Sequence, residues 1–205
     1  TGSSCRECEV IYWGYSELED GVWSPLQQAR REFETRPKSG SEPDVVARCD
    51  NALFFIEAKL ASGNNTLLRS KDSAVKEKFV TGGKRWYSQV FRSEFETVAI
   101  AEKKYELLRF WLLGTWIANS LGLDFYLVNL VLSEREKEIE HVFRPHIRDN
   151  EHRRFLRATW EDIYRFIQNR QLSSGNKDIL TTYFEEKILG YNSQGRLQKA
   201  FSLPR

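Results

Sequence analysis

The stretch that decides the fold is residues 41–60, SEPDVVARCDNALFFIEAKL. It contains two runs rich in β-forming residues, VVARC and ALFFIEAK, which are separated by Asp50 and Asn51. These two residues tolerate the left-handed backbone of a tight two-residue turn, so the stretch predicts a β-hairpin. Glu57 and Lys59 follow the apolar run, and buried charges of this kind need a partner or a metal ion.

Counting outward from the turn places Cys49 opposite Ala52 and Asp44 opposite Glu57. Opposed residues on one face have Cβ atoms about 4.5–5.5 Å apart, and Lys59 lies on the diagonal at roughly 7–8 Å. Two carboxylates this close repel by about 4 kcal/mol at 4 Å and a dielectric constant near 20, so they trap a proton or bind a cation. Because Mg²⁺ often sits on one or two carboxylates, water and phosphate, we predict a Mg²⁺ or Mn²⁺ site here.

A metal site next to a lysine suits phosphodiester hydrolysis. A bound cation can lower the pKa of a water molecule and polarise a phosphate, and Lys59 can orient or deprotonate that water or stabilise the anionic transition state. The simpler alternative is an ordinary strand that ends in a surface ion pair between Glu57 and Lys59, with Asp44 in a turn after Pro43. The register of the hairpin and the apolar residues that precede Glu57 favour the metal site.

These residues resemble a known motif. Pro43-Asp44, twelve intervening residues and then Glu57-Ala58-Lys59 after an apolar strand are similar to the pattern of the PD-(D/E)xK nuclease superfamily. The resemblance implies a restriction-endonuclease-like fold with Asp44 and Glu57 as metal ligands and Lys59 as the catalytic lysine. It also implies that the backbone carbonyl of Ala58 is a further ligand.

Members of the superfamily often add an acidic residue from the helix that precedes the hairpin. Ser24-Pro25 followed by LQQARREFE predicts such a helix, with Ser24 as its N-cap. Glu32 is the preferred additional ligand and Glu34 the alternative. The implied function is a metal-dependent endonuclease acting on DNA in restriction, repair or defence, while an inactive nucleic-acid-binding or assembly module and an RNA nuclease remain alternatives.

The rest of the chain predicts an α/β fold. The pattern is mostly helical from about residue 84 to residue 121, with breaks at 93–96 and at Gly114. Residues 124–132 predict a strand covered on both faces, and residues 154–160 predict another strand followed by a helix. We therefore expect a restriction-endonuclease-like core with a mixed central sheet of about four to five strands flanked by helices.

The length of 205 residues allows one domain. We expect a core of about 25–170 and a C-terminal helical extension of about 171–205. Residues 110–132 approach the length of a membrane span, but polar residues interrupt them, so a buried helix followed by a strand is expected.

Three cysteines, with Cys5 and Cys8 as the close pair, do not make a disulfide framework. We expect reduced thiols and a cytoplasmic protein.

The formal net charge is only +2, so any basic surface must be local. Residues 69–92 contain seven Lys or Arg against two acids, which predicts a surface that follows a phosphate backbone. The candidate contacts to nucleic acid are Lys76, Lys78, Lys84, Arg85, Gln89 and Arg92. A second basic cluster could also bind phosphate, but we expect it to consist of solvated loop arginines, namely Arg144, Arg148, Arg153, Arg154 and Arg157. The expected partner is nucleic acid, not a membrane, and a homodimer is left open.

Overall fold

The centre of the molecule is a seven-stranded mixed sheet with the strand order β3-β2-β1-β4-β5-β6-β7. The computed structural model describes residues 8–36, 40, 42–60, 62–68, 73–169, 174–187, 189–191 and 197–199. The strands of the sheet are β1 (Cys8–Tyr12), β2 (Tyr15–Ser16), β3 (Gly21–Val22), β4 (Val45–Cys49), β5 (Ala52–Ala58), β6 (Asp124–Val131) and β7 (Arg153–Thr159). The mixed α/β architecture is confirmed, but the expected number of strands was too low. Three strands precede the first helix, and two of them are too short to produce a periodic pattern.

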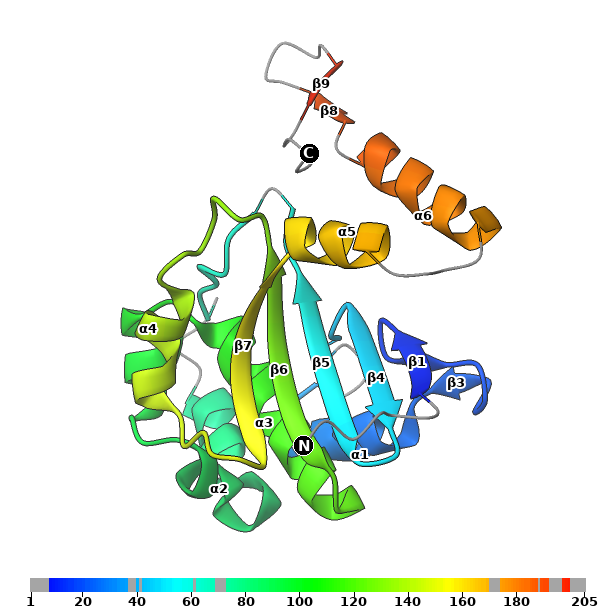
Figure 1. Cartoon of the computed structure of the whole chain (residues 1–205). Helices are drawn as coiled ribbons and strands as arrows, with labels where there is room; N and C mark the ends of the chain where they lie inside the picture. Colours follow the sequence, from blue (N-terminus) through cyan, green and yellow to red (C-terminus); the bar gives the residue numbers. More distant parts are fainter. Residues whose placement is uncertain are drawn as a thin grey trace.

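Six α-helices and two shorter helical turns accompany the sheet in the described part of the chain. They are α1 (Ser24–Phe33), α2 (Ser73–Val90), the π-helical turn η2 (Thr97–Ala101), α3 (Tyr105–Leu121), α4 (Ile139–Phe143), the 3-10 turn η3 (Arg144–His146), α5 (Trp160–Asn169) and α6 (Ser174–Lys187). Figure 1 shows α1 and α3 behind the sheet and α5 across its upper end. Beyond α6, β8 (Leu189–Tyr191) and β9 (Leu197–Lys199) form a separate antiparallel pair, so the C-terminal extension is not purely helical.

The predicted β4–β5 hairpin is confirmed in its register. Val45 pairs with Ile56 and Arg48 with Leu53, which is the antiparallel alignment that the Asp50-Asn51 turn predicts. On the other side, β5 pairs with β6 and β6 with β7, both in parallel. The sheet therefore changes from antiparallel to parallel pairing at β5.

The alternation along β5 explains why a carboxylate is buried at its end. Leu53 and Phe55 are fully buried, and Glu57 follows them on the same face because side chains alternate along a strand. Phe55 packs edge-on against Phe125 of β6 at 5.5 Å between ring centroids. Since α3 contacts this same pair of strands, Glu57 points toward the helical layer.

The helices differ from the expectations in three details. Trp23 occupies the N-cap of α1, while the backbone N of Ser24 donates to Glu19 Oε2 at 2.7 Å, so Ser24 does not have the predicted role. The helix expected from about residue 84 begins at Ser73, and its backbone leaves the helical conformation at residues 82–85.

Gly114 does not break α3. It lies inside the helix, where an added Cβ would overlap the ring of Phe125, so the glycine allows α3 and β6 to approach closely. The expected helix and strand over residues 110–132 are thus confirmed. In the described part of the chain, none of the helices has the length and apolar character needed to cross a membrane.

The expectation of unpaired cysteines was wrong for two of them. Strand β1 pairs antiparallel with β4, and this alignment sets Cys8 opposite Cys49, where a disulfide joins them. The sequence pattern does not indicate β1 as a strand, so it gives no reason to expect Cys8 beside the hairpin. Cys5 lies outside the described residues.

Candidate active site

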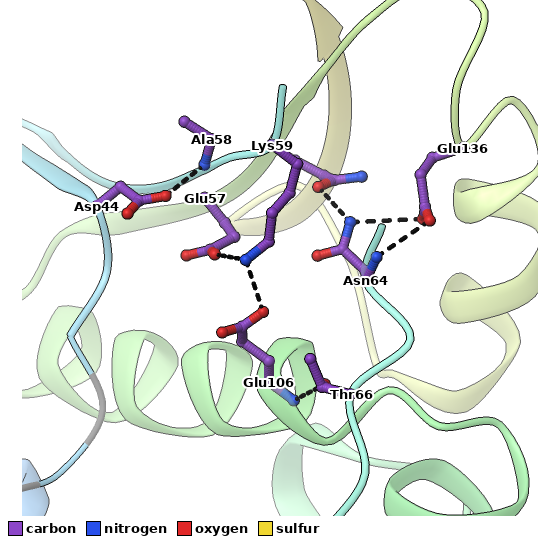
Figure 2. A network of polar contacts seen from close by, with 9 residues as sticks. Asp44, Glu57, Ala58, Lys59, Asn64, Thr66, Glu106 and Glu136 are labelled. Atoms are coloured by element: carbon purple, nitrogen blue, oxygen red, sulfur yellow. Dashed lines mark hydrogen bonds and ion pairs between the residues drawn. The ribbon is translucent and has the colours of Figure 1, made fainter. Parts of the chain in front are cut away.

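Asp44 lies directly before β4. Because Val45 pairs with Ile56, the next residues outward, Asp44 and Glu57, lie opposite each other. Its Oδ2 accepts a hydrogen bond from the backbone N of Ala58 at 2.8 Å (Figure 2). Its backbone oxygen accepts another from the N of Trp13 at 3.2 Å. Both neighbouring strands therefore hold Asp44, and the predicted convergence of Asp44, Glu57 and Lys59 is found.

The backbone of Ala58 is turned toward Asp44. In a strand, the N–H and C=O groups of one residue point to the same side. The N–H of Ala58 points to Asp44, whereas the N of Lys59 donates to Leu130 O of β6 at 2.8 Å. The carbonyl of Ala58 is consequently on the Asp44 side, where it can serve as a third oxygen ligand.

Glu57 is a buried carboxylate with a perturbed pKa. Its exposed fraction is 3%. Burial raises its pKa to about 7, the hydrogen bond from Lys59 opposes this shift, and the charges of Glu106 and Asp44 add to it. Near neutral pH, Glu57 is therefore poised between a bound proton and the negative charge that attracts a cation.

Lys59 bridges two carboxylates. Its Nζ forms ion pairs with Glu57 Oε1 and with Glu106 Oε2, the latter at 3.0 Å. Burial lowers the pKa of Lys59, but the hydrogen bonds and charges of the two carboxylates outweigh this effect and raise it. The ammonium form is thus held in place between them, as Figure 2 shows.

Glu106 is the site residue that sequence reasoning missed. It lies in the first turn of α3, where its backbone N donates to Thr66 Oγ1 at 2.8 Å. The sequence does show an acidic residue at the start of the helix that precedes β6. That its side chain contacts Lys59 follows only from the packing of α3 on the sheet.

A second polar layer adjoins the site on β6. Asn129, which pairs with Glu57 across the parallel ladder, is fully buried, and its Oδ1 accepts from Asn64 Nδ2 at 2.8 Å. The N and Nδ2 of Asn64 also donate to the Glu136 carboxylate, at 3.1 and 3.4 Å. Asn64 Oδ1 and Asn129 Nδ2 have no hydrogen-bond partner among the described residues. The layer therefore adds one free acceptor and one free donor beside Glu57. Buried polar groups without a partner are rare in folded proteins.

The residues present fit a divalent cation. Asp44, Glu57 and Glu106 bring three negative charges against the single positive charge of Lys59, so two negative charges are left when all are ionised. Their oxygen donors are the type that Mg²⁺ and Mn²⁺ prefer. The described residues contain no group of three or more His, Cys, Asp or Glu placed to hold a metal. A cation would therefore rest on Asp44, Glu57 and the Ala58 carbonyl, together with water and phosphate oxygens.

The two acidic candidates, Glu32 in α1 and Glu34 at its C-cap, are engaged elsewhere. Glu32 Oε2 accepts from the backbone N of Gly83 at 3.2 Å, and Glu34 Oε1 pairs with Arg109 Nη2 at 3.1 Å. The carboxylate that pairs with Lys59 in addition to Glu57 is Glu106 of α3 and not a residue of α1. The expected role of Glu32 thus gains no support from its contacts.

The candidate basic residues on and near α2 differ in their surroundings. Lys76 forms an ion pair with Glu96, which offsets its charge. Lys78 is half-buried, and the remaining candidates are exposed, namely Lys84, Arg85, Gln89 and Arg92. Trp86 donates to Thr115 Oγ1 of α3 at 3.0 Å. Thr115 is nine residues beyond Glu106, or about 14 Å along the helix axis, so Lys84 and Arg85 lie well away from Lys59.

The second basic cluster is not simply solvated. Arg157 Nη2 donates to three backbone carbonyls, those of Leu132, Ser133 and Arg135. Arg144 donates to Phe155 O at 2.9 Å. These guanidinium groups tie β7 to the segment between β6 and η3, so the expectation of solvated arginines was wrong for them.

Comparison of the chain with protein-family models, with curated proteins and with solved structures finds no significant match. Evidence for a function therefore comes from the geometry and chemistry of the site itself.

Proposed function

We propose that this protein is a metal-dependent nuclease of the PD-(D/E)xK kind, with a restriction-endonuclease-like core, which hydrolyses phosphodiester bonds in DNA. The observation that carries the proposal is the convergence of Asp44, Glu57 and Lys59 at one end of the β4–β5 hairpin. A surface ion pair would not bury Glu57 to 3% exposure or place one lysine between two carboxylates.

Each residue has a distinct task in this proposal. Asp44, Glu57 and the Ala58 carbonyl hold Mg²⁺ or Mn²⁺, which when bound supplies an activated water and charge neutralisation at the phosphate. Lys59 orients the attacking water and offers its ammonium to the developing negative charge. Glu106 would keep Lys59 in position if the carboxylate of Glu57 holds a cation.

The test is incubation of the purified protein with plasmid, linear and single-stranded DNA, and with RNA, in the presence of Mg²⁺ or Mn²⁺. We expect cleavage that falls about 100-fold or more in Asp44→Ala and in Lys59→Ala. A matched control is Lys137→Ala, which removes a lysine from the exposed ion pair with Glu134 and should leave the rate unchanged. Cleavage that persists in Asp44→Ala and Lys59→Ala would refute the assignment. Salt-sensitive binding without cleavage by the wild type would favour a binding module instead.

A further inference from the structure

A hollow of about 220 Å³ lies at the end of the sheet where β6 and β7 begin, the lower end in Figure 1. Its deepest lining is apolar and almost fully buried, whereas its open side carries polar side chains from the turn before β7. An apolar depth with a few polar groups at the rim is typical of small-ligand sites. We call this space the Trp86 hollow, and its lining includes Trp86, Ala118, Phe125, Asn150, His152 and Arg153.

Trp86 is held in place by a hydrogen-bonded chain to α3. Its Nε1 donates to Thr115 Oγ1 at 3.0 Å, and Thr115 Oγ1 in turn donates to Trp111 O at 2.7 Å. The indole N–H is therefore used inside the protein. What the half-buried Trp86 offers to a ligand is the carbon surface of its ring, which suits another planar ring.

Arg153 is oriented at the rim and keeps part of its guanidinium group free. Asn150 Oδ1 accepts from the backbone N of Arg153 at 3.1 Å, which fixes the turn. Arg153 Nε donates to Arg148 O at 2.8 Å, so one edge of the guanidinium group is anchored. Among the described residues, Nη1 and Nη2 of Arg153 have no hydrogen-bond partner. These donors are available for a phosphate oxygen.

The positive charge at the rim is not compensated within the described part of the chain. Neither Arg148 nor Arg153 forms an ion pair there, and burial together with the charge of Arg148 lowers the pKa of Arg153. The nearby carboxylates of Asp124 and Glu151 are instead directed to the His152 ring, at 2.9 and 3.8 Å. Two neighbouring guanidinium groups without a carboxylate of their own attract an anion.

The Trp86 hollow is separate from the carboxylates of the candidate active site. Phe125 lines the hollow, while Asn129, which pairs with Glu57, follows four residues later on β6, or about 13 Å along the strand. Ala118 lies twelve residues beyond Glu106, or about 18 Å along α3. A ligand in the hollow therefore does not reach Glu57 or Glu106, and its binding is independent of the proposed nuclease function.

We propose that the Trp86 hollow binds a nucleotide unit, with its base against Trp86 and its phosphate on Arg153. An inorganic phosphate would leave the apolar lining unused, and an uncharged ring would leave the free donors of Arg153 unpaired. The volume is below that of pockets that enclose a drug-sized ligand, so the base enters and the sugar and phosphate stay at the rim. A free mononucleotide and an unpaired terminal nucleotide of a nucleic acid offer this same chemistry.

The experiment is isothermal titration calorimetry in EDTA, where no divalent cation is held at the carboxylates. The ligands are dAMP, deoxyadenosine, inorganic phosphate and a 5′-phosphorylated single-stranded oligonucleotide. We expect dAMP to bind more tightly than deoxyadenosine or phosphate. Arg153→Gln should weaken dAMP binding about tenfold or more, since it removes a charge-assisted contact. The matched control Arg135→Gln removes an exposed arginine beyond the other end of β6 and should bind dAMP as the wild type does.

A second measurement locates the ligand. In ¹⁵N-labelled protein, the indole N–H signal of Trp86, identified by its absence in Trp86→Phe, should shift when dAMP is added. If the oligonucleotide binds in an Arg153-dependent way and dAMP does not, the nucleotide unit belongs to a nucleic acid.

Four outcomes would overturn the inference. They are equal affinity of Arg153→Gln and the wild type, equal affinity of dAMP and inorganic phosphate, binding that leaves the Trp86 signal unmoved, and no binding of dAMP or the oligonucleotide by the wild type. Because calorimetry in EDTA does not involve cleavage, a failure of the proposed nuclease function would leave these results unchanged.

Discussion

The two ends of the β4–β5 hairpin are held together in different ways. At the closed end, the strands are joined by the Asp50-Asn51 turn, and the disulfide from Cys8 to Cys49 adds β1 to the pair. At the open end, the carboxylates of Asp44 and Glu57 face one another, and burial raises the pKa of Glu57. The turn and the disulfide at the closed end thus fix the strand register, and this register keeps the carboxylates close together at the open end although they repel. Stable parts of a fold commonly support unfavourable arrangements of charges at a functional site in this way.

The largest expected effect concerns the closed end. The double variant Cys8→Ser/Cys49→Ser should lower the free energy of unfolding by about 2–4 kcal/mol, because the unfolded chain gains the freedom of the opened loop. Urea denaturation measures this change. Cleavage at a temperature where the variant is folded should stay close to that of the wild type. A reducing agent should reproduce the loss in the wild type and add nothing in the variant, and an unaffected wild type would show that the cysteines are not bonded.

The open end should respond to pH. The pKa of Glu57 is raised from 4.5 to about 7 on folding, so above pH 4.5 the unfolded chain loses this proton while the folded protein retains it. The free energy of unfolding should therefore fall as the pH rises from about 4.5 to about 7, by up to about 3 kcal/mol, and then level off.

Urea denaturation across this pH range measures the effect, and Glu57→Gln is the matched control because it removes the titrating group. The variant should lack this part of the pH dependence. Saturating Mg²⁺ should restore stability at pH 8 in the wild type but not in Glu57→Gln. Identical pH profiles for the two proteins would contradict the burial of an ionisable Glu57.

The smallest expected effect sharpens the role of α3 at the open end. Glu106→Gln should lower the cleavage rate about tenfold, since residues that orient a functional group typically contribute 10- to 100-fold. Its melting temperature should change little, and Glu94→Gln, which neutralises an exposed carboxylate, is the control. A loss in Glu106→Gln as large as that in Lys59→Ala would make Glu106 a direct ligand, and an unchanged rate would remove it from the site.

Local rules were sufficient for the hairpin and for several other elements. The turn residues and the alternation of ALFFIE predicted which side chains of β4 and β5 face each other, and the structure has that register. The apolar run of β6 and the proline near the start of α1 likewise predicted a strand and a helix where they occur. These features depend on neighbours in sequence, so they could be inferred without the fold.

The rest depends on contacts between distant segments. Pairing of β1 with β4 produces the disulfide and brings Trp13 to Asp44, and neither follows from spacing along the chain. The kink at residues 82–85 and the contact of Trp86 with α3 carry Lys84 and Arg85 away from the carboxylates. A count of charges could not reveal this displacement.

The sequence by itself determined that Asp44, Glu57 and Lys59 meet at one end of a hairpin, because a two-residue turn and a side-chain period of two leave a single register with the apolar face buried. Only the tertiary structure decided how deeply Glu57 is buried, that Glu106 is the third carboxylate, and that the backbone of Trp13 is bonded to Asp44. Burial and these neighbours arise when α3 and β1 pack against the hairpin, and the geometry of that packing is not encoded in any one local stretch.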